Sequence, residues 1–358
     1  MVEWKELCDF LNFEQPTPYL VKSTEYDNSY KTPVLTAGQS LLLGYTNELD
    51  GIYEADKDNP CIIFDDFTTS FHWIDYSFKV KSSAMKMLKP KANTNFRYVY
   101  YAMQQIRFVP QQHQRHWISK YSHFQIPIPS LEEQNRIVGI LDTFTDSIEN
   151  LKQQIAQRRK QYEHYRDQLL DLEGKEGVEW KKLNTVCEVI NGRAYKQQEL
   201  LAVGKYRVLR VGNFFSNDSW YFSDLELDDK YYCNEGDLLY AWSASFGPHI
   251  WTEEKTIYHY HIWKMNCSEE LDKKYMFYWL QSENMRKQAF SHLHGATMAH
   301  LTKALMESLN VPLPPLSEQQ RIVSILDTFE ASISNLEAQL AQRQKQYEYY
   351  RNQLLTFE

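Results

Sequence analysis

The 358-residue chain has no apolar run that approaches the 18 or more residues of a membrane-spanning helix. Its first residues, Met-Val-Glu-Trp-Lys-Glu-Leu, lack the basic segment and the apolar core of a secretory signal peptide. Hydrophobic residues make up 43% of the chain, which is ordinary for a globular protein. The sequence therefore predicts a cytoplasmic protein of two or three domains, each able to bury its own core.

Cysteines are few and scattered, and recognisable catalytic motifs are missing. The five cysteines, Cys8, Cys61, Cys187, Cys233 and Cys267, include no Cys-x-x-Cys pair, so they predict neither a disulfide framework nor a zinc site. There is no GxxxxGK[ST] loop, no GxGxxG after a strand, and no GxSxG, HExxH or kinase signature. The [DN]PP[FY] segment of amino-methyltransferases is also absent. We therefore predict no catalytic residue, no metal and no cofactor in this chain.

The chain also lacks a positive charge balance. Its net charge is -8, which argues against a protein that binds nucleic acid over its whole surface. Segregated charge could still place a basic face beside acidic helices. Aromatic residues reach 15% of the chain, a content compatible with large recognition surfaces.

What the chain does contain is an internal repeat. Residues 126–173 and 311–358 align without a gap at a constant offset of 185 residues and are identical at about two thirds of the positions. A shorter repeat, Glu3-Trp4-Lys5 and Glu179-Trp180-Lys181, opens the region before each copy. The order globule, helix, globule, helix therefore indicates an internal duplication.

Each repeated stretch predicts a long helix with an apolar seam. Apolar residues recur every 3.5 positions over more than four heptads, which is the period of a coiled coil. From Leu131 or Leu316 onward each helix spans about 40 residues, or roughly 60 Å. Arg158 and Arg343 interrupt the seam, either fixing the register or extending to solvent along their aliphatic stems. The predicted seam consists of Leu141, Phe144, Ile148, Leu151 and Ile155, with Leu326, Phe329, Ile333, Leu336 and Leu340.

The repeats divide the chain into four predicted parts: a first globule (1–125), a first helix and linker (126–177), a second globule (178–310) and a second helix (311–358). Both globules combine strand-like runs, such as 71–80 and 257–265, with an aromatic helical stretch, so the fold class is α+β. Antiparallel packing of the two helices would bring the end of each helix to the other globule. An antiparallel coiled coil with an internal pseudo-two-fold repeat is therefore expected.

Candidate binding residues lie mostly in loops at predicted strand ends, where hydroxyls, amides and cations can contact phosphates or base edges. In the first globule they are Tyr45, Thr46, Thr68, Thr69, Lys79, Lys81, Ser82 and Arg115. In the second globule they are Arg193, Ser243, Ser245, His294, Thr297, His300 and Lys303.

Two further groups of polar residues leave alternatives open. The histidines at 113 and 116, 259 and 261, and 292 and 294 could contact bases or phosphates, lie in the core or bind a metal, although no ligand set accompanies them. Asp65-Asp66 could be a catalytic pair, part of a turn or a group that reads cytosine.

At this point the chain resembles the DNA-specificity subunits of type I restriction-modification systems. The resemblance rests on the Pro-x-Pro-x-Leu-x-Glu-Gln-x-x-Ile segments at 127–137 and 312–322, the heptad helices and the Glu-Trp-Lys openings. The segments 44–53, 62–69, 236–247 and 294–303 look like parts of target-recognition domains. The resemblance covers essentially the whole chain.

The resemblance implies that each globule, as a target-recognition domain, reads one half of an asymmetric, two-part sequence in double-stranded DNA. The helices would separate the globules and dock two methyltransferase subunits, and ATP-dependent restriction/translocase subunits would join them. S-adenosylmethionine, ATP and Mg would then be bound by partner subunits, with no cofactor in this chain. Two other classes stay open: a coiled-coil protein-interaction scaffold without DNA specificity, and a single-chain restriction enzyme, which would need the missing motifs.

Overall fold

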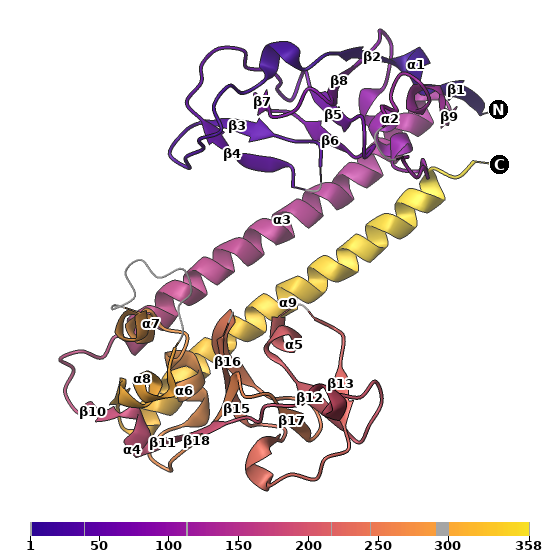
Figure 1. The fold of residues 1–358 in the computed structure, drawn as a ribbon. Helices are drawn as coiled ribbons and strands as arrows, with labels where there is room; N and C mark the ends of the chain where they lie inside the picture. The colour runs from indigo at the N-terminus through magenta and orange to yellow at the C-terminus, as the bar shows by residue number, and fades with distance from the viewer. Residues whose placement is uncertain are drawn as a thin grey trace. The chain divides into compact units, whose positions relative to one another are not determined.

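A computed structural model describes residues 2–38, 40–111, 114–215, 217–243, 245–290 and 301–357. The chain divides into two compact units, one of Met1–Leu151 with Gln339–Glu358 and one of Lys152–Ala338. Two long helices, α3 (Leu131–Leu170) and α9 (Leu316–Leu354), each contribute one half to each unit (Figure 1). Each globule therefore packs with the start of its own helix and the end of the other one. No helix in these described ranges has the length and apolarity needed to cross a membrane.

The first unit contains two small sheets and one isolated strand pair. Strands β1 (Glu3–Glu6) and β9 (Gln125–Ile128) pair antiparallel. One sheet has the order β2 (Leu11–Glu14), β8 (Met85–Pro90), β5 (Cys61–Asp65) and β6 (Phe71–Ile74). The other has the order β4 (Leu42–Thr46), β3 (Thr32–Leu35) and β7 (Lys79–Val80), in which β3 and β7 are parallel. The helical segments are α1 (Leu7–Phe10), η1 (Thr17–Tyr19), α2 (Phe96–Met103) and η2 (Tyr121–His123).

Both faces of strand β5 are buried, which explains its uninterrupted apolar sequence. Successive side chains of a strand point to opposite faces. Ile62 and Phe64 lie in a core with α2 and α3, while Cys61 and Ile63 lie in a second core with strands β3 and β7. Leu355, at the end of α9, belongs to the first of these cores. The antiparallel packing predicted from the sequence is thus present in this unit.

The second unit repeats this plan with different residues. Strands β10 (Glu179–Lys182) and β19 (Asn310–Leu313) pair antiparallel. One sheet has the order β11 (Cys187–Asn191), β18 (Ile262–Cys267), β15 (Leu238–Ser243) and β16 (Ser245–Ile250). The other has the order β13 (Tyr221–Ser223), β12 (Tyr206–Leu209), β17 (Thr256–Tyr258) and β14 (Tyr232–Cys233), with β12 and β17 parallel. The helical segments are α4 (Leu183–Val186), η3 (Gln197–Glu199), α5 (Val211–Phe215), η4 (Asp229–Tyr231), α6 (Lys273–Trp279), α7 (Glu283–Phe290) and α8 (Lys303–Ser308).

The strand registers match between the globules, so residues can be equated. Strand β2 begins with Leu11 opposite Pro90, and β11 begins with Cys187 opposite Cys267. Counting along the ladders from these pairs makes Lys86 equivalent to Trp263. The partners across the sheet agree, because Phe64 faces Lys86 and Tyr240 faces Trp263. The internal repeat therefore extends into the globules, where the sequences have diverged.

The short helices α2 and α6 are each anchored by two equivalent hydrogen bonds, one to the strand before the long helix and one to the long helix itself. The Tyr98 hydroxyl donates to the Pro127 carbonyl at 2.7 Å, and its counterpart Tyr275 donates to Pro312 at 2.9 Å. Tyr101 and Tyr278 donate to the carboxylates of Asp142 and Asp327, at 2.5 and 2.6 Å.

The glutamine of the repeated proline segment also has the same role twice. Gln134 donates to the Pro129 carbonyl and Gln319 to the Pro314 carbonyl, both at 2.9 Å. These bonds satisfy carbonyls just before each helix begins. The segment therefore has a structural role in both copies.

The long helices pack with the same side-chain layer in both units. Phe144 stacks on Tyr350 at 5.3 Å between ring centroids, and Phe329 stacks on Tyr165 at 5.4 Å. The Arg343 guanidinium lies 5.6 Å from the centre of the Phe144 ring, and Arg158 lies 5.8 Å from that of Phe329. These are cation–π contacts across the seam. Of the ten predicted seam residues, Leu141, Ile155 and Leu326 are buried and the other seven are half-buried.

Two stretches that were each predicted as one strand are in fact divided between two strands. Residues 71–80 form not one strand but β6 and β7, which belong to different sheets, and residues 257–265 are divided between β17 and β18. In both places a turn, at 75–78 and at 259–261, moves the chain from one sheet to the other. Aromatic residues occupy these turns, so the apolar pattern alone gave no sign of them.

Candidate nucleic-acid interface

In the first globule, three loops meet around a buried ion pair. Lys86 Nζ lies 3.0 Å from Asp66 Oδ2, and both side chains are at most 2% exposed. Asp66 Oδ1 also accepts the backbone N–H groups of His116 and Trp117, at 3.0 and 2.8 Å. The Asp66 N–H donates to the Ala84 carbonyl at 2.9 Å. We call the loops 65–70, 81–84 and 114–117 the first edge. Asp66 holds them together, through its carboxylate to 114–117 and through its backbone N–H to 81–84.

The neighbouring Asp65 shapes the loop that carries two predicted residues. Its Oδ1 accepts the N–H groups of Phe67 and Thr68, both at 2.8 Å, as in an Asx turn. Thr69 then adopts a φ of 59°, which is uncommon for a β-branched residue. Thr68 is exposed at the tip. Both carboxylates are thus engaged in turn and loop contacts, which favours the turn among the three alternatives for Asp65-Asp66. The buried Asp66 cannot reach a base.

The remaining residues of the first edge are accessible cations and turn hydroxyls. Lys81 is exposed, with its Nζ 5.9 Å from the centre of the Tyr26 ring. Ser82 Oγ accepts the Ala84 N–H at 3.1 Å. Arg115 is exposed, and neither it nor Lys81 has a carboxylate partner among the described residues. The structure thus brings Thr68, Thr69, Lys81, Ser82 and Arg115 to one set of adjoining loops.

Three predicted residues of the first globule lie elsewhere. Lys79 is 1% exposed, donates to the carbonyls of Asp50 and Gly51 at 2.5 and 3.1 Å, and pairs with Glu48 at 3.2 Å. Thr46 is also 1% exposed, and Tyr45 is half-buried. Lys79 and Thr46 are therefore corrected to structural residues. Because both residues of β7 are buried, a cation in it must be paired inside the protein.

In the second globule, an aromatic and histidine-rich edge takes the equivalent place. The second edge comprises residues 191–195, 242–243, 245 and 259–261. Trp242 stacks on the buried Trp263 at 5.6 Å, and its Nε1–H donates to the Tyr260 carbonyl at 2.9 Å. Ser243 and Ser245 face each other at the end of the β15–β16 hairpin, and both are half-buried.

Arg193 lies in this edge but is already paired. Its guanidinium makes two hydrogen bonds to Glu199, at 2.9 and 2.8 Å. These bonds raise the pKa of Arg193 and lower the pKa of Glu199 to about 2. Gly192 beside it is required, because a Cβ there would lie 2.4 Å from the His259 carbonyl oxygen. The charge of Arg193 is thus largely compensated, which makes it a weaker candidate for a phosphate contact.

Sequence reasoning omitted two residues from the predicted set. The His259 N–H donates to the Leu209 carbonyl, as the Lys81 N–H donates to Leu35, so His259 is the counterpart of Lys81. Burial, followed by His261 and Arg210, lowers the pKa of His259 to about 4, so the ring is neutral near pH 7. Arg210 is exposed directly after strand β12 and has no carboxylate partner in the described part of the chain. The sequence signal for Arg210 was its position at a strand end.

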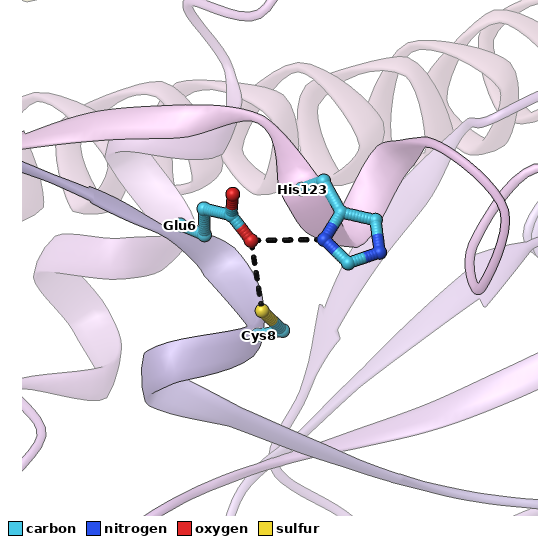
Figure 2. A group of neighbouring side chains, drawn as sticks. All are labelled: Glu6, Cys8 and His123. Atoms are coloured by element: carbon cyan, nitrogen blue, oxygen red, sulfur yellow. Dashed lines mark hydrogen bonds and ion pairs between the residues drawn. The ribbon is translucent and has the colours of Figure 1, made fainter.

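One further predicted residue that the structure describes, Lys303, lies away from this edge. Lys303 begins α8 and pairs with Glu307 at 3.4 Å. His294, Thr297 and His300 lie outside the described residues. Among the residues that are described, one group of three metal-ligating side chains occurs: Glu6, Cys8 and His123, in the first unit (Figure 2).

The helix pair carries a groove whose residues recur in the duplication. In the second unit a groove of about 660 Å³ lies along α3 and α9. It is lined by Arg158, Gln161, Tyr165, Gln168, Leu169, Lys175, Glu318, Arg321, Ile325 and Phe329. All except Lys175 have an identical residue 185 positions away in the sequence, for example Tyr350 for Tyr165 and Arg136 for Arg321.

Another groove along the same helices has diverged at four of its helix positions. It has a volume of about 400 Å³ and includes Arg159, Glu330, Ser334 and Glu337. The counterparts of these four residues are Gln344, Thr145, Glu149 and Lys152. These four positions thus differ between the copies, whereas the α3 and α9 residues of the groove that contains Tyr165 do not.

Comparisons with known proteins give one consistent result. A family model described as the type I restriction modification DNA specificity domain matches residues 1–158 and 175–344. The specificity subunit of the Escherichia coli type I restriction enzyme EcoR124I/EcoR124II is 35% identical over 387 residues, covering 99% of this chain and 94% of that protein. A putative type I restriction enzyme specificity subunit of Haemophilus influenzae is 27% identical and covers 99% and 96%.

Solved structures show the same fold. The type I restriction-modification S subunit of M. genitalium aligns over 100% of this chain and 97% of that one, with a TM-score of 0.61 and 14% identity. A chain from a structural study of complex assembly and conformational transition in a type I R-M system aligns over 99% and 96%, with a TM-score of 0.58 and 15% identity.

Proposed function

The chain belongs to the family of type I restriction-modification DNA specificity subunits, and we propose that it selects the DNA site for a methyltransferase and restriction assembly. Each globule reads one half of an asymmetric, two-part sequence through its edge. The chain chooses the site and performs no catalysis. S-adenosylmethionine, ATP and Mg belong to partner subunits, and the assembly acts in the cytoplasm.

The observation that carries this proposal is one backbone plan with two different edges. The strand registers match, yet Lys81 in the first edge corresponds to His259 in the second, and Asp66 to Trp242. A lysine suits phosphate or guanine, while a neutral histidine and an indole offer different hydrogen bonds and stacking surfaces. Two half-sites of different sequence are the expected result.

The duplicated groove supports two copies of one partner. Two copies of the same methyltransferase subunit need two identical docking surfaces, whereas surfaces that bind nothing are free to diverge. The helix residues that line the groove around Tyr165 recur around Tyr350 and meet this requirement, whereas the groove around Glu337 differs at four positions. Exposed aromatic rings such as Tyr165 and Tyr350, both 44% exposed, are common anchors at interfaces.

The first experiment co-expresses the chain with its methyltransferase subunit and maps methylated adenines across the host genome. A two-part motif with a fixed spacer, lost when this chain is omitted, is the expected result.

Replacing residues 1–125 with the first globule of a relative should change one half of that motif and leave the other unchanged. If an assembled, cofactor-bound complex methylates no motif, the protein is instead a coiled-coil scaffold.

A second experiment tests the docking surfaces by native mass spectrometry. Tyr165→Ala or Tyr350→Ala should each reduce the stoichiometry from two methyltransferase subunits to one, and the double variant to none. Tyr349→Ala is the matched control, because Tyr349 is 60% exposed, lies outside the repeated groove and corresponds to His164. Loss of one subunit in the control, or of none in the double variant, would reject this surface.

A further inference from the structure

Three side chains that commonly bind metal ions converge in the first unit (Figure 2). Glu6 ends strand β1, Cys8 lies in α1, and His123 ends the short helix η2. Glu6 Oε2 lies 2.8 Å from His123 Nδ1 and 3.3 Å from Cys8 Sγ. All three ligand atoms lie within 4.8 Å of one another. An oxygen, a sulfur and a nitrogen thus face a common point, although 117 residues separate Glu6 from His123.

The backbone fixes these positions independently of the side chains. Glu6 faces Gln125 in the β1–β9 ladder, and the Leu7 N–H donates to the Phe124 carbonyl at 3.0 Å. Leu7 and Tyr121 are both at most 2% exposed, so the elements on either side are anchored in the core. The site is therefore prearranged, because the segments that carry the ligands are held by main-chain bonds.

The mixed ligand set suits zinc. Calcium and magnesium prefer oxygen ligands alone, whereas zinc binds carboxylate, thiolate and imidazole in a tetrahedron. Zinc–ligand bonds of about 2.0–2.3 Å place neighbouring tetrahedral ligands roughly 3.3–3.5 Å apart. The observed separations of 2.8 and 3.3 Å are close to this spacing. Zinc entry would thus require only small side-chain movements.

The surrounding charges are also compatible with a cation. Glu6 and a Cys8 thiolate together supply two negative charges, and the Asp9 carboxylate lies close by, accepting the Glu6 N–H at 3.1 Å. Lys91 opposes them, because its Nζ donates to the Cys8 carbonyl at 2.6 Å. Glu6 and Cys8 are half-buried and His123 is exposed, so an ion can reach them from solvent.

We propose that Glu6, Cys8 and His123 form a zinc site that joins the β1–α1 segment to the chain leading into β9 and α3. The fourth position is open to water. The Cys8 proton is released to solvent when the thiolate binds the ion. The site is a structural clip within the first unit, and its test does not depend on DNA binding.

The internal repeat provides a comparison inside the same molecule. Lys182 and Asn310 close the β10–β19 ladder as Glu6 and Gln125 close the β1–β9 ladder. The counterparts of the three ligands are consequently Lys182, Asn184 and Ser308, none of which is a good zinc ligand. One zinc ion per chain is therefore expected, not two.

The test is zinc titration of the untagged, full-length protein in competition with a chromophoric chelator. We expect one zinc per chain, and Cys8→Ser and His123→Ala should each weaken binding at least about tenfold, the lower limit for changes to outer-shell partners. Cys267→Ser is the matched control, since Cys267 is another half-buried thiol. Wild-type affinity in Cys8→Ser, or loss of binding in Cys267→Ser, would overturn the proposal.

A spectroscopic measurement identifies the ligand directly. Cobalt bound to the wild-type chain should show a thiolate-to-metal charge-transfer band that is absent from Cys8→Ser and present in Cys267→Ser. Zinc should also raise the unfolding temperature of the wild type but not that of Cys8→Ser. Binding without a Cys8-dependent band would place the metal elsewhere and reject the site.

Discussion

At equivalent positions in their sheets, the first globule has a buried ion pair and the second has two stacked indoles, of which Trp263 is buried and Trp242 is half-buried. Lys86 and Asp66 occupy the places of Trp263 and Trp242. The ion pair organises its edge by directional bonds, because Asp66 also accepts two backbone N–H groups. The indoles contribute mainly apolar area and one hydrogen bond to Tyr260. One backbone plan thus tolerates opposite chemistries at the layer that supports the candidate interface.

This difference shows which parts of the fold vary between the two globules and which are kept. The tyrosine hydrogen bonds that anchor α2 and α6, to a proline carbonyl and to an aspartate of the long helix, are repeated, whereas the layer beneath the edges is replaced as a unit. Replacing one member alone would leave a buried charge without a partner. We therefore expect the ion pair and the indole pair to respond differently to single substitutions.

The largest effect is expected for Asp66→Asn. This change leaves the buried Lys86 ammonium without its counter-charge, which costs about 3–5 kcal/mol when one partner of a buried pair is removed. Urea denaturation, with hydrogen exchange to localise the change to the first unit, measures this loss. The double variant Asp66→Asn with Lys86→Met should recover most of it, because it removes the buried charge while the amide oxygen can still accept the N–H groups of His116 and Trp117. A loss below about 1 kcal/mol in Asp66→Asn would show that the pair is not a supporting element.

A smaller effect is expected for Trp242→Ala in the second unit. Trp242 is half-buried, so loss of the stack and of its buried area should cost about 2 kcal/mol, less than for a fully buried tryptophan. Trp242→Phe retains much of the stack but loses the hydrogen bond to Tyr260, and should cost about 1 kcal/mol. The same denaturation experiment measures both. Equal losses in the two variants would mean that the hydrogen bond, not the stack, supports this edge.

The edges should also differ in their response to salt. In the assembled complex, Lys81→Ala should reduce the slope of log affinity against log salt by about one, as for loss of one phosphate contact. His259→Ala should leave the slope unchanged near pH 7.5, because its ring is neutral there. Lys57→Ala is the control, since Lys57 is exposed before the opposite end of β5. A slope change for His259→Ala equal to that for Lys81→Ala would remove the distinction between the edges.

The sequence allowed the helices, the duplication and the order of the parts to be predicted, because a heptad pattern and a gapless repeat are local and strong signals. It also placed Thr68, Lys81 and Arg115 in loops that the structure brings together. Strand ends are marked by polar residues, and this signal was sufficient for Thr68 and Lys81, whereas Arg115 lies in the segment of His113 and His116.

What the sequence could not show depends on contacts between distant residues. Nothing local distinguishes the buried Lys79, which is held by Glu48 and the carbonyl of Asp50, from the exposed Lys81 two residues later. The pairing of Arg193 with Glu199 and the equivalence of Lys81 with His259 follow only from strand registers. The Glu6–Cys8–His123 group was missed for the same reason.

The smallest expected effect is a pH dependence confined to the second unit. The pKa of His259 is about 4 in the folded chain and near 6.5 when unfolded, so the unfolded state binds more protons between these values. The stability that His259 contributes is therefore complete above pH 6.5 and is lost as the pH falls toward 4. His261 and Arg210 face the ring and reinforce this direction. Because the ring is partly exposed, the loss of stability from pH 7 to pH 5 should be under about 1 kcal/mol.

His259→Asn should flatten this part of the pH profile of the second unit, measured by denaturation, and leave the first unit unchanged. A profile as steep as that of the wild type would assign the pH dependence to another group, such as His249, whose pKa is also lowered by burial.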